Sequence, residues 1–238
     1  MRSPSIRPNT GAIHLQTAPE LAAQALREAI ISGELKGGDR VLEQKWSLRL
    51  GVGQPTLREA LLELEHQGLV YKRQQRGTYV AQMSPEAYQQ ILEVRIPLES
   101  IAIGRAAALL TSEQEKELVK LVDTMSASNV ESDAKIFHDC DVLFHRTIWE
   151  IAGNPYLAEV LETITFRLFV FSIVGRWDGN PSSASERAAA VKQHQNMLAG
   201  IRTRDAKRAR QMFVKSTVKY WNAQYKLKLK LEDLLPDE

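Results

Sequence analysis

The fold of this chain is decided by residues 51–61, which read GVGQPTLREAL. After Pro55, apolar side chains recur at helical spacing, so one face of this segment must be buried. These side chains are Leu57, Ala60, Leu61 and Leu64. A matching pattern precedes the stretch and ends at Gly51: Leu42, Trp46, Leu48 and Leu50. Two short helices joined by a glycine turn predict a helix-turn-helix.

The second of these helices carries polar side chains at its amino-terminal end, namely Gln54, Thr56 and Arg58. In a helix-turn-helix this end enters the major groove of DNA, where such groups bond to base edges or phosphates. Pro55 is compatible with this position, because the first N–H groups of a helix have no intrahelical partner. The alternative is an ordinary pair of core helices, and the residues that follow weigh against it.

After Gly68 the pattern changes to two short β-prone runs, residues 69–73 (LVYKR) and 78–81 (TYVA), around the polar loop 74–77. Such a pattern predicts a β-hairpin. Helix, turn, helix and basic hairpin in this order predict a winged helix, with double-stranded DNA as its partner.

These residues resemble the GntR family of bacterial transcription regulators, over the first third of the chain. The matching segments are 26–35 (LREAIISGEL), 38–42 (GDRVL), 51–52 (GV), 57–61 (LREAL), 65–70 (EHQGLV) and 76–77 (RG). The family commonly has serine and arginine where this chain has Gly53 and Gln54. An arginine at this position can donate two hydrogen bonds to the edge of a guanine base. Because this chain lacks that arginine, we expect its operator to differ from the usual family sequence.

The DNA-contacting residues expected from this arrangement come from both helices and the hairpin. Arg58 is expected to bond to a guanine edge or a phosphate, and Gln54 to pair with adenine. Thr56 adds a hydroxyl beside them. The remaining contacts are expected from Gln44, Lys45 and Arg49 to the DNA backbone, and from Arg76 and Gly77 in the wing to the minor groove.

Composition sets the broad class of protein. The 238 residues include 44% hydrophobic ones, enough to fill a core, and Cys140 is the single cysteine, so no internal disulfide forms. No apolar run approaches membrane-spanning length, and we expect a soluble cytoplasmic protein. Residues 1–83 hold 11 Lys or Arg against 8 Asp or Glu, whereas residues 84–238 hold 20 against 21. The modest basic surplus of the first part favours two DNA readers in one homodimer that binds a palindromic operator.

The chain is predicted to be mainly α, with four parts. We expect a flexible arm at 1–16, a winged helix-turn-helix with a small hairpin wing at 17–83, an all-helical effector-binding and dimerisation domain at 84–230, and a tail at 231–238. Apolar periodicity predicts a helix through Pro97 and further helices at about 112–126, 131–152, 155–174, 183–202 and 204–229.

The second part resembles the FCD effector domain of the FadR subfamily of GntR regulators. The resemblance is carried by residues 94–95 (VR) with 98–99 (LE), by Asp141 with Phe144 and His145, by residues 152–154 (AGN), and by His194 with Leu198, Ile201, Asp205 and Ala209. It implies a helical bundle that binds a small effector and changes the DNA affinity of the attached reader.

A metal site is indicated by the spacing of acidic and imidazole side chains. Asp141 and His145 are four residues apart on one helical face, His138 lies near that face, and His194 belongs to a later helix. Asp and His ligands from several helices suit zinc or nickel. The resemblance makes Asp141, His145 and His194 three of four ligands, but Ser216 stands where the fourth, a histidine, is expected. We therefore expect weak or absent metal binding, completed by His138, water or an effector carboxylate; the alternative is a pocket whose polar groups only hydrogen-bond.

The effector is expected to be a small carboxylate, because the helical part carries several guanidinium groups that suit such a ligand. The candidates are Arg95, Arg146 and Arg167, with Asn154 as an orienting group and Trp177 on the same helices. The resemblance places Arg95 in the effector pocket; the competing interpretation is a surface ion pair with Glu99, four residues on.

We predict a regulator and not an enzyme, because no Ser-His-Asp arrangement, phosphate-binding glycine loop or Cys-His pair accompanies the metal-ligand candidates. Two alternatives stay open. One is a metal-free regulator whose helical domain binds a larger apolar ligand such as an acyl thioester. The other is a metal-dependent hydrolase that uses Asp141, His145 and His194.

Overall fold

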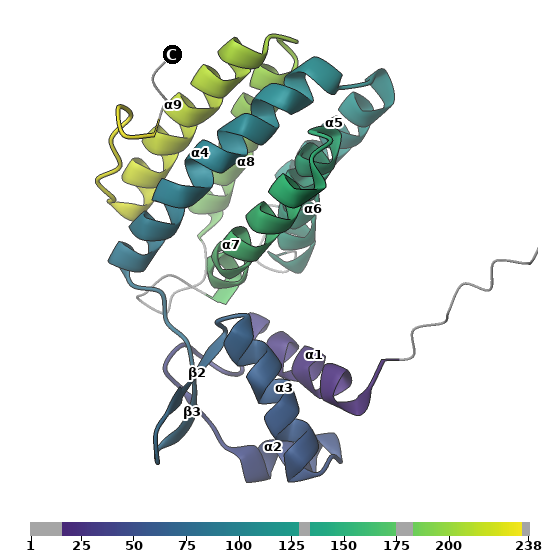
Figure 1. Cartoon of the computed structure of the whole chain (residues 1–238), viewed down its shortest axis with the longest axis vertical. Coiled ribbons are helices and arrows are strands. Elements are labelled where there is room, and N and C mark those ends of the chain that lie inside the picture. The colour runs from purple at the N-terminus through teal and green to yellow at the C-terminus, as the bar shows by residue number, and fades with distance from the viewer. Residues whose placement is uncertain (1–15, 129–133, 175–182, 235–238) are drawn as a thin grey trace, which may run out of the picture.

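The computed structural model describes residues 16–128, 134–174 and 183–234, and they form two lobes joined by the chain between β3 and α4 (Figure 1). The smaller lobe contains α1 (Ala18–Ile31), β1 (Arg40–Val41), α2 (Glu43–Leu50), α3 (Gln54–His66), β2 (Val70–Arg73) and β3 (Gly77–Val80). The larger lobe contains α4 (Pro85–Leu109), α5 (Ser112–Ala127), α6 (Ala134–Ile151), α7 (Pro155–Val174), α8 (Ala184–Ile201) and α9 (Ala206–Tyr225). Most of the expected arm, the region of Trp177 and the end of the expected tail lie outside the described residues.

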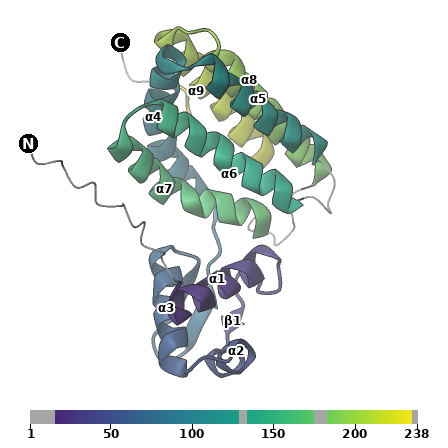
Figure 2. The same cartoon turned by 90° about the vertical axis from the view of Figure 1, so that its right-hand side faces the viewer.

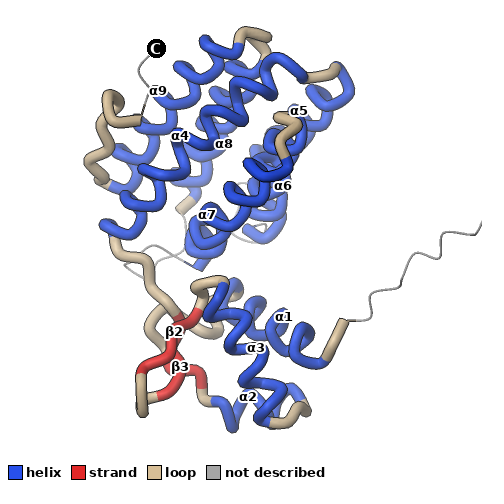
Figure 3. The backbone as a smooth tube through the Cα atoms, in the orientation of Figure 1, coloured by secondary structure: helices blue, strands red, loops and turns tan. Residues whose placement is uncertain are grey.

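The smaller lobe is the predicted winged helix. Gly51 ends α2 in the left-handed conformation, with φ +65°, and Pro55 lies in the first turn of α3, as the sequence predicts. The described strands all belong to this lobe (Figure 3) and form one antiparallel sheet in the order β1-β3-β2. The strand β1 was not anticipated, because its two residues are too few to give an alternating pattern.

The larger lobe is the predicted all-helical domain. Helix α4 continues through Pro97, and α5 begins with a capping box in which Thr111 and Gln114 exchange hydrogen bonds. Within the described residues, no helix is long and apolar enough to cross a membrane.

The last helix ends earlier than its apolar periodicity predicts. Helix α9 stops at Tyr225 and not near residue 229, because Lys226 adopts the left-handed conformation with φ +52°. The amide of Asn222 then bonds both the N–H and the carbonyl of Leu229, at 2.9 Å each. Since Leu227 and Leu229 are buried, the alternating apolar residues of this segment pack onto the bundle without being helical.

The two lobes are in direct contact through α7, which lies over α1 in Figure 2. Val170 belongs to the apolar core of the winged helix, and Phe166 packs against the same core. Arg167 lies over Gly68, at the end of α3. The next residues, Leu168 and Phe169, face the interior of the helical domain. One stretch of α7 therefore takes part in both cores.

Candidate functional site

The first candidate site is an open groove on the winged helix, formed where α2, α3 and the wing meet. Its lining includes five residues that the sequence predicts as DNA contacts: Gln44, Lys45, Gln54, Arg58 and Gly77. Residues from two helices and a strand thus face one surface. This is the geometry in which one helix end and a wing can contact a duplex together.

Within this groove Arg58 is held by Glu43, with 3.0 Å between Nε and Oε2, while 63% of the Arg58 side chain stays exposed. Arg40 also lines the groove and packs against Gly77. Arg40 was missed by the sequence reasoning, although a basic residue directly before α2 and opposite the wing is a usable signal.

The remaining predicted DNA contacts lie outside the groove lining. Arg49 bonds to Glu34 and lies over the ring of Trp46, 4.6 Å from its centroid. Thr56 is half-buried in the first turn of α3, and Arg76 is exposed at the turn of the wing. Arg49 thus lies beside the groove in an exposed ion pair, since the side chains of Arg49 and Glu34 are 49% and 46% exposed.

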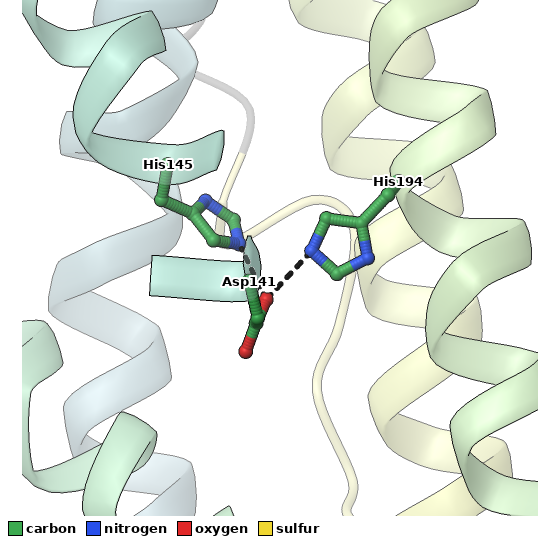
Figure 4. A group of neighbouring side chains, drawn as sticks. All are labelled: Asp141, His145 and His194. Atoms are coloured by element: carbon green, nitrogen blue, oxygen red, sulfur yellow. Dashed lines mark ion pairs between the residues drawn. The ribbon is translucent and has the colours of Figure 1, made fainter. Parts of the chain in front are cut away.

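The second candidate site is a cavity of about 130 Å³ inside the helical domain, between α4, α6, α7, α8 and α9. Asp141, His145 and His194 meet in it, with one ligand atom from each within 4.8 Å of the others. Figure 4 shows the two imidazoles on either side of the Asp141 carboxylate. Asp141 Oδ1 lies 2.7 Å from Nε2 of His194 and 3.6 Å from Nε2 of His145. The sequence prediction of these three residues as one group is met.

The other ring nitrogen of each histidine has an oxygen partner. Nδ1 of His145 lies 2.7 Å from Glu99 Oε1, and Nδ1 of His194 lies 2.7 Å from the carbonyl of Ala190. Because a carbonyl and a carboxylate can only accept, both Nδ1 atoms carry hydrogen and donate it. Both Nε2 atoms then face Asp141, which is the orientation that metal-binding histidines adopt.

The charges of the cavity keep both acids ionised. Burial alone would raise the pKa of Glu99, but Arg95 and then His145 outweigh it and lower that pKa to about 2. Burial would likewise raise the pKa of Asp141, and the imidazoles of His194 and His145 hold it well below its usual value. Burial lowers the pKa of His145, which favours its neutral form.

The arrangement fits a divalent cation on one further observation. Nε2 of His194 is buried and makes no hydrogen bond of acceptable geometry, although Asp141 is only 2.7 Å away. An anionic oxygen and two imidazole nitrogens that converge on one point are a donor set for zinc or nickel. Asp141, His145 and His194 are thus a possible metal site.

The two candidates for a fourth ligand differ in position. His138 lines the cavity, and its buried Nδ1 makes no hydrogen bond, yet it lies outside the three-residue group. Ser216 is not among the lining residues; its hydroxyl donates to the carbonyl of Phe213 and accepts from Gln193. Helix α9 presents Thr217 to the cavity instead.

Arg95 lies at the cavity and also takes part in an ion pair. Arg95 lines the cavity, as the resemblance implies, and it also pairs with Glu99, with 2.9 Å between Nε and Oε2. The pair is buried and not at the surface, since the two side chains are 7% and 1% exposed. Glu99, regarded from the sequence only as an ion-pair partner, proves to connect Arg95 to His145.

The other three predicted effector residues do not come together with Arg95. Asn154 caps α7 by accepting from the N–H of Leu157 at 3.2 Å. Arg146 pairs with Glu162 at the surface, and Arg167 lies against the winged helix. Sequence spacing placed them on the right helices but could not show which way they point. Arg187, which does line the cavity and is 7% exposed, was missed.

Comparisons with known proteins agree with this architecture. Residues 20–80 match the model for bacterial regulatory proteins of the gntR family, and residues 90–215, more than half of the chain, match the FCD domain. The HTH-type transcriptional repressor NanR of Enterobacter sp. (strain 638) is 28% identical, over 86% of this chain and 83% of its own length. The gluconate operon transcriptional repressor of Bacillus licheniformis is 24% identical, over 76% and 74%.

Two solved structures have the same fold. McbR/YncC of E. coli superposes with a TM-score of 0.69 at 20% identity, covering 89% of this chain and 99% of that one. A GntR transcriptional regulator from Rhodococcus sp. RHA1 gives a TM-score of 0.72 at 18% identity, covering 89% and 98%. The matched families are transcription regulators and not enzymes. The chain belongs to the GntR family of bacterial transcription regulators, with a winged helix-turn-helix followed by an FCD domain.

Proposed function

We propose that this protein is a cytoplasmic regulator of the FadR subfamily that binds a palindromic operator as a homodimer and responds to a small carboxylate. The observation that carries the proposal is the convergence of Asp141, His145 and His194 in one cavity, on the same domain that packs against the DNA-binding lobe. The cavity and the core of the winged helix are connected by one helix, α7, which contributes Phe169 to the former and Val170 to the latter.

The operator is proposed to be read by the groove residues, with Gln54 and Arg58 at the base edges and Gln44 and Lys45 at the backbone. Thr56, Arg76 and Arg49 are proposed as lesser contacts from the rim of this surface. A net charge of only +3 on residues 1–83 supports a dimer, because one reader offers few phosphate contacts. Monomers by sedimentation at micromolar concentration, with undiminished operator binding, would contradict this.

The metal is proposed to be zinc or nickel, held by Asp141, His145 and His194. When bound, such an ion offers its remaining coordination positions to water or to carboxylate oxygens. Glu99 and the carbonyl of Ala190 fix the tautomers that present Nε2 to it. Because Ser216 faces Gln193, we propose that the effector or water, and not α9, completes the shell.

A change in the cavity can alter DNA binding through α7. Phe169 lines the cavity and lies 5.6 Å from the ring of His145, while Val170 is in the core of the winged helix. A ligand that shifts Phe169 therefore moves a helix to which the reader is attached. Only a ligand with different affinities for two relative poses of the lobes would change operator affinity.

The proposal omits Arg146, Arg167 and Asn154 from the effector site, because each is occupied elsewhere. The alternative of a metal-free regulator for a larger apolar ligand is weakened by the cavity volume of about 130 Å³, which is small for an acyl thioester. A long chain would also have to pass the ionised Glu99 and Asp141.

The test is metal analysis together with operator selection. Purified protein dialysed against zinc should hold about one ion per chain, and His194→Ala should hold none. His66→Ala, which removes an exposed histidine of the winged helix, is the matched control and should keep the ion. Equal zinc content in the native protein and His194→Ala would exclude this site. Failure to select any specific sequence from a random DNA pool would exclude the operator-binding role.

A further inference from the structure

One leucine of the winged helix lies almost entirely in solvent. Leu48 belongs to the apolar pattern that predicts α2, yet its exposed fraction is 86%, the largest of any large apolar side chain in the described residues. Helix α2 buries Trp46 and Ser47 instead. Burial of a leucine ordinarily stabilises a folded protein, so the fold gains little from Leu48. A single exposed leucine is common on protein surfaces, and its position must therefore decide whether it has a role.

Leu48 lies in the lining of the groove where α2, α3 and the wing meet. It shares that lining with Gln54 and Arg58, the two residues of α3 proposed to read base edges. Gln44, four residues before Leu48 and therefore on the same side of α2, lines the groove as well. Helix α2 lies at the end of the smaller lobe that is farthest from the helical domain (Figure 1). The exposed leucine is thus part of the surface that faces DNA.

Leu42 gives the groove a second apolar side chain. It directly precedes α2, is 50% exposed and belongs to the same lining. Of the other exposed large apolar side chains described for this lobe, Leu21 and Leu62 lie outside the lining. Apolar and polar side chains therefore face one surface along α2 and α3. A molecule that fills this groove needs both kinds of group.

The major groove of DNA offers such a combination. Its base edges present hydrogen-bond donors and acceptors and one apolar group, the C5-methyl of thymine. A leucine cannot bond to a phosphate, and there it would displace water without replacing the lost hydrogen bond. Gln54 is proposed to pair with adenine, and the thymine opposite that adenine carries its methyl group in the same groove. Leu48 and Gln54 line one groove of the protein and can meet neighbouring groups of the DNA.

We propose that Leu48 contacts the methyl group of one thymine in each half-site of the operator, beside the adenine read by Gln54, and is a specificity-determining residue. This inference rests on the proposed function, since it needs the amino-terminal end of α3 in the major groove. It adds an apolar contact from α2 to the polar contacts from α3.

The test removes the methyl group and nothing else. In an operator selected from random DNA, each thymine is replaced in turn by deoxyuridine, which keeps every hydrogen-bonding group of thymine. At the thymine in contact with Leu48, one such exchange should weaken binding of the full-length protein about fourfold, the effect of leaving one methyl group unburied. Titration of a fluorescent operator at one salt concentration gives the affinity ratio of thymine to uracil at each position.

Three variants assign the methyl contact to one side chain. Leu48→Ala should bring the ratio at the sensitive position close to one, because alanine lacks the apolar atoms that cover the methyl group. Leu48→Met keeps a long apolar side chain and should retain a ratio above one. Leu62→Ala is the matched control, since it removes an exposed leucine of α3 outside the groove lining and should leave the ratio at about four. Both leucines are exposed and alanine is a strong helix former, so these proteins should fold.

Three results would overturn the inference while the regulator stands. The first is a selected operator in which no exchange of thymine for uracil weakens binding. The second is an exchange that weakens binding equally for the native protein and for Leu48→Ala. The third is a Leu48→Ala protein that loses operator affinity with every ratio unchanged and sediments as a monomer, which would place Leu48 in a contact between two subunits. Selection of no sequence at all would contradict the proposed function, and the inference with it.

Discussion

Two arginine–glutamate pairs in this protein have nearly the same geometry and opposite surroundings. In the groove of the winged helix, Arg58 and Glu43 are 3.0 Å apart, and their side chains are 63% and 28% exposed. In the cavity of the helical domain, Arg95 and Glu99 are 2.9 Å apart, and their side chains are 7% and 1% exposed. The chemistry of each pair is the same, so any difference in their effects must come from the solvent around them.

In water a guanidinium can exchange its carboxylate partner for another anion at little cost, since an exposed pair contributes about 0–1 kcal/mol. Arg58 is thus held in position by Glu43 and remains available to a base or phosphate. In the interior, the charge of either partner is costly to bury without the other. Arg95 is therefore fixed, and with it Glu99 and the tautomer of His145. The exposed pair suits recognition, and the buried pair suits positioning.

The largest expected effect comes from removing the carboxylate of each pair. Glu99→Gln should lower the free energy of unfolding by about 3–5 kcal/mol, because it leaves the buried Arg95 without a counter-charge. Glu43→Gln is the matched change at the surface and should alter it by no more than about 0.5 kcal/mol. Urea denaturation of both variants measures the difference. Equal losses would mean that burial does not distinguish the two pairs.

An intermediate effect is expected for operator binding. Arg58→Ala should weaken specific binding by about 1–3 kcal/mol, the value of a good contact to a base edge. Arg49→Ala, the matched change on α2, should cost much less, because Arg58 lines the groove and Arg49 lies outside its lining. Titration of a fluorescent operator with each variant, at one salt concentration, gives the comparison. Should both variants lose affinity equally, Arg49 must leave Glu34 to contact DNA.

The same contrast explains what the sequence could predict. The winged helix follows from local signals, because Gly51, Pro55 and the apolar spacing of α2 and α3 lie within a few dozen residues. Its groove residues are near neighbours in the chain and share one surface, as expected. The FCD domain was predicted as helices, but its cavity is assembled from five of them. Only Asp141 and His145 are close enough in sequence for their common face to be derived directly.

The parts that were not predicted depend on tertiary packing. Glu99 orients His145, because its Oε1 lies 2.7 Å from Nδ1 of that histidine. The two residues are 46 positions apart in the sequence, so no helical spacing could have indicated this contact. Arg187 points into the cavity, whereas Arg146 is drawn to Glu162 on the neighbouring helix. Guanidinium groups on amphipathic helices look alike in sequence, and the rotation of each helix in the bundle decides which of them are enclosed.

The smallest expected effect concerns the contact between the two lobes. Gly68 has φ +72°, and a methyl group there would meet the guanidinium of Arg167 on α7. Gly33 has a similar φ of +76° and nothing within 4 Å of the added carbon. Alanine at either position should cost about 1 kcal/mol of backbone strain, because L residues rarely adopt this conformation. The two variants therefore match in strain and differ only in the interlobe contact.

We expect Gly33→Ala to lower the melting temperature by a few degrees and to keep a single calorimetric transition. Gly68→Ala should lower it by a similar amount and also keep a single transition, because the guanidinium of Arg167 is the end of a flexible side chain and can move aside. Val170 then still joins α7 to the core of the winged helix. A split transition in Gly68→Ala would mean that the Arg167 contact itself holds the two lobes together.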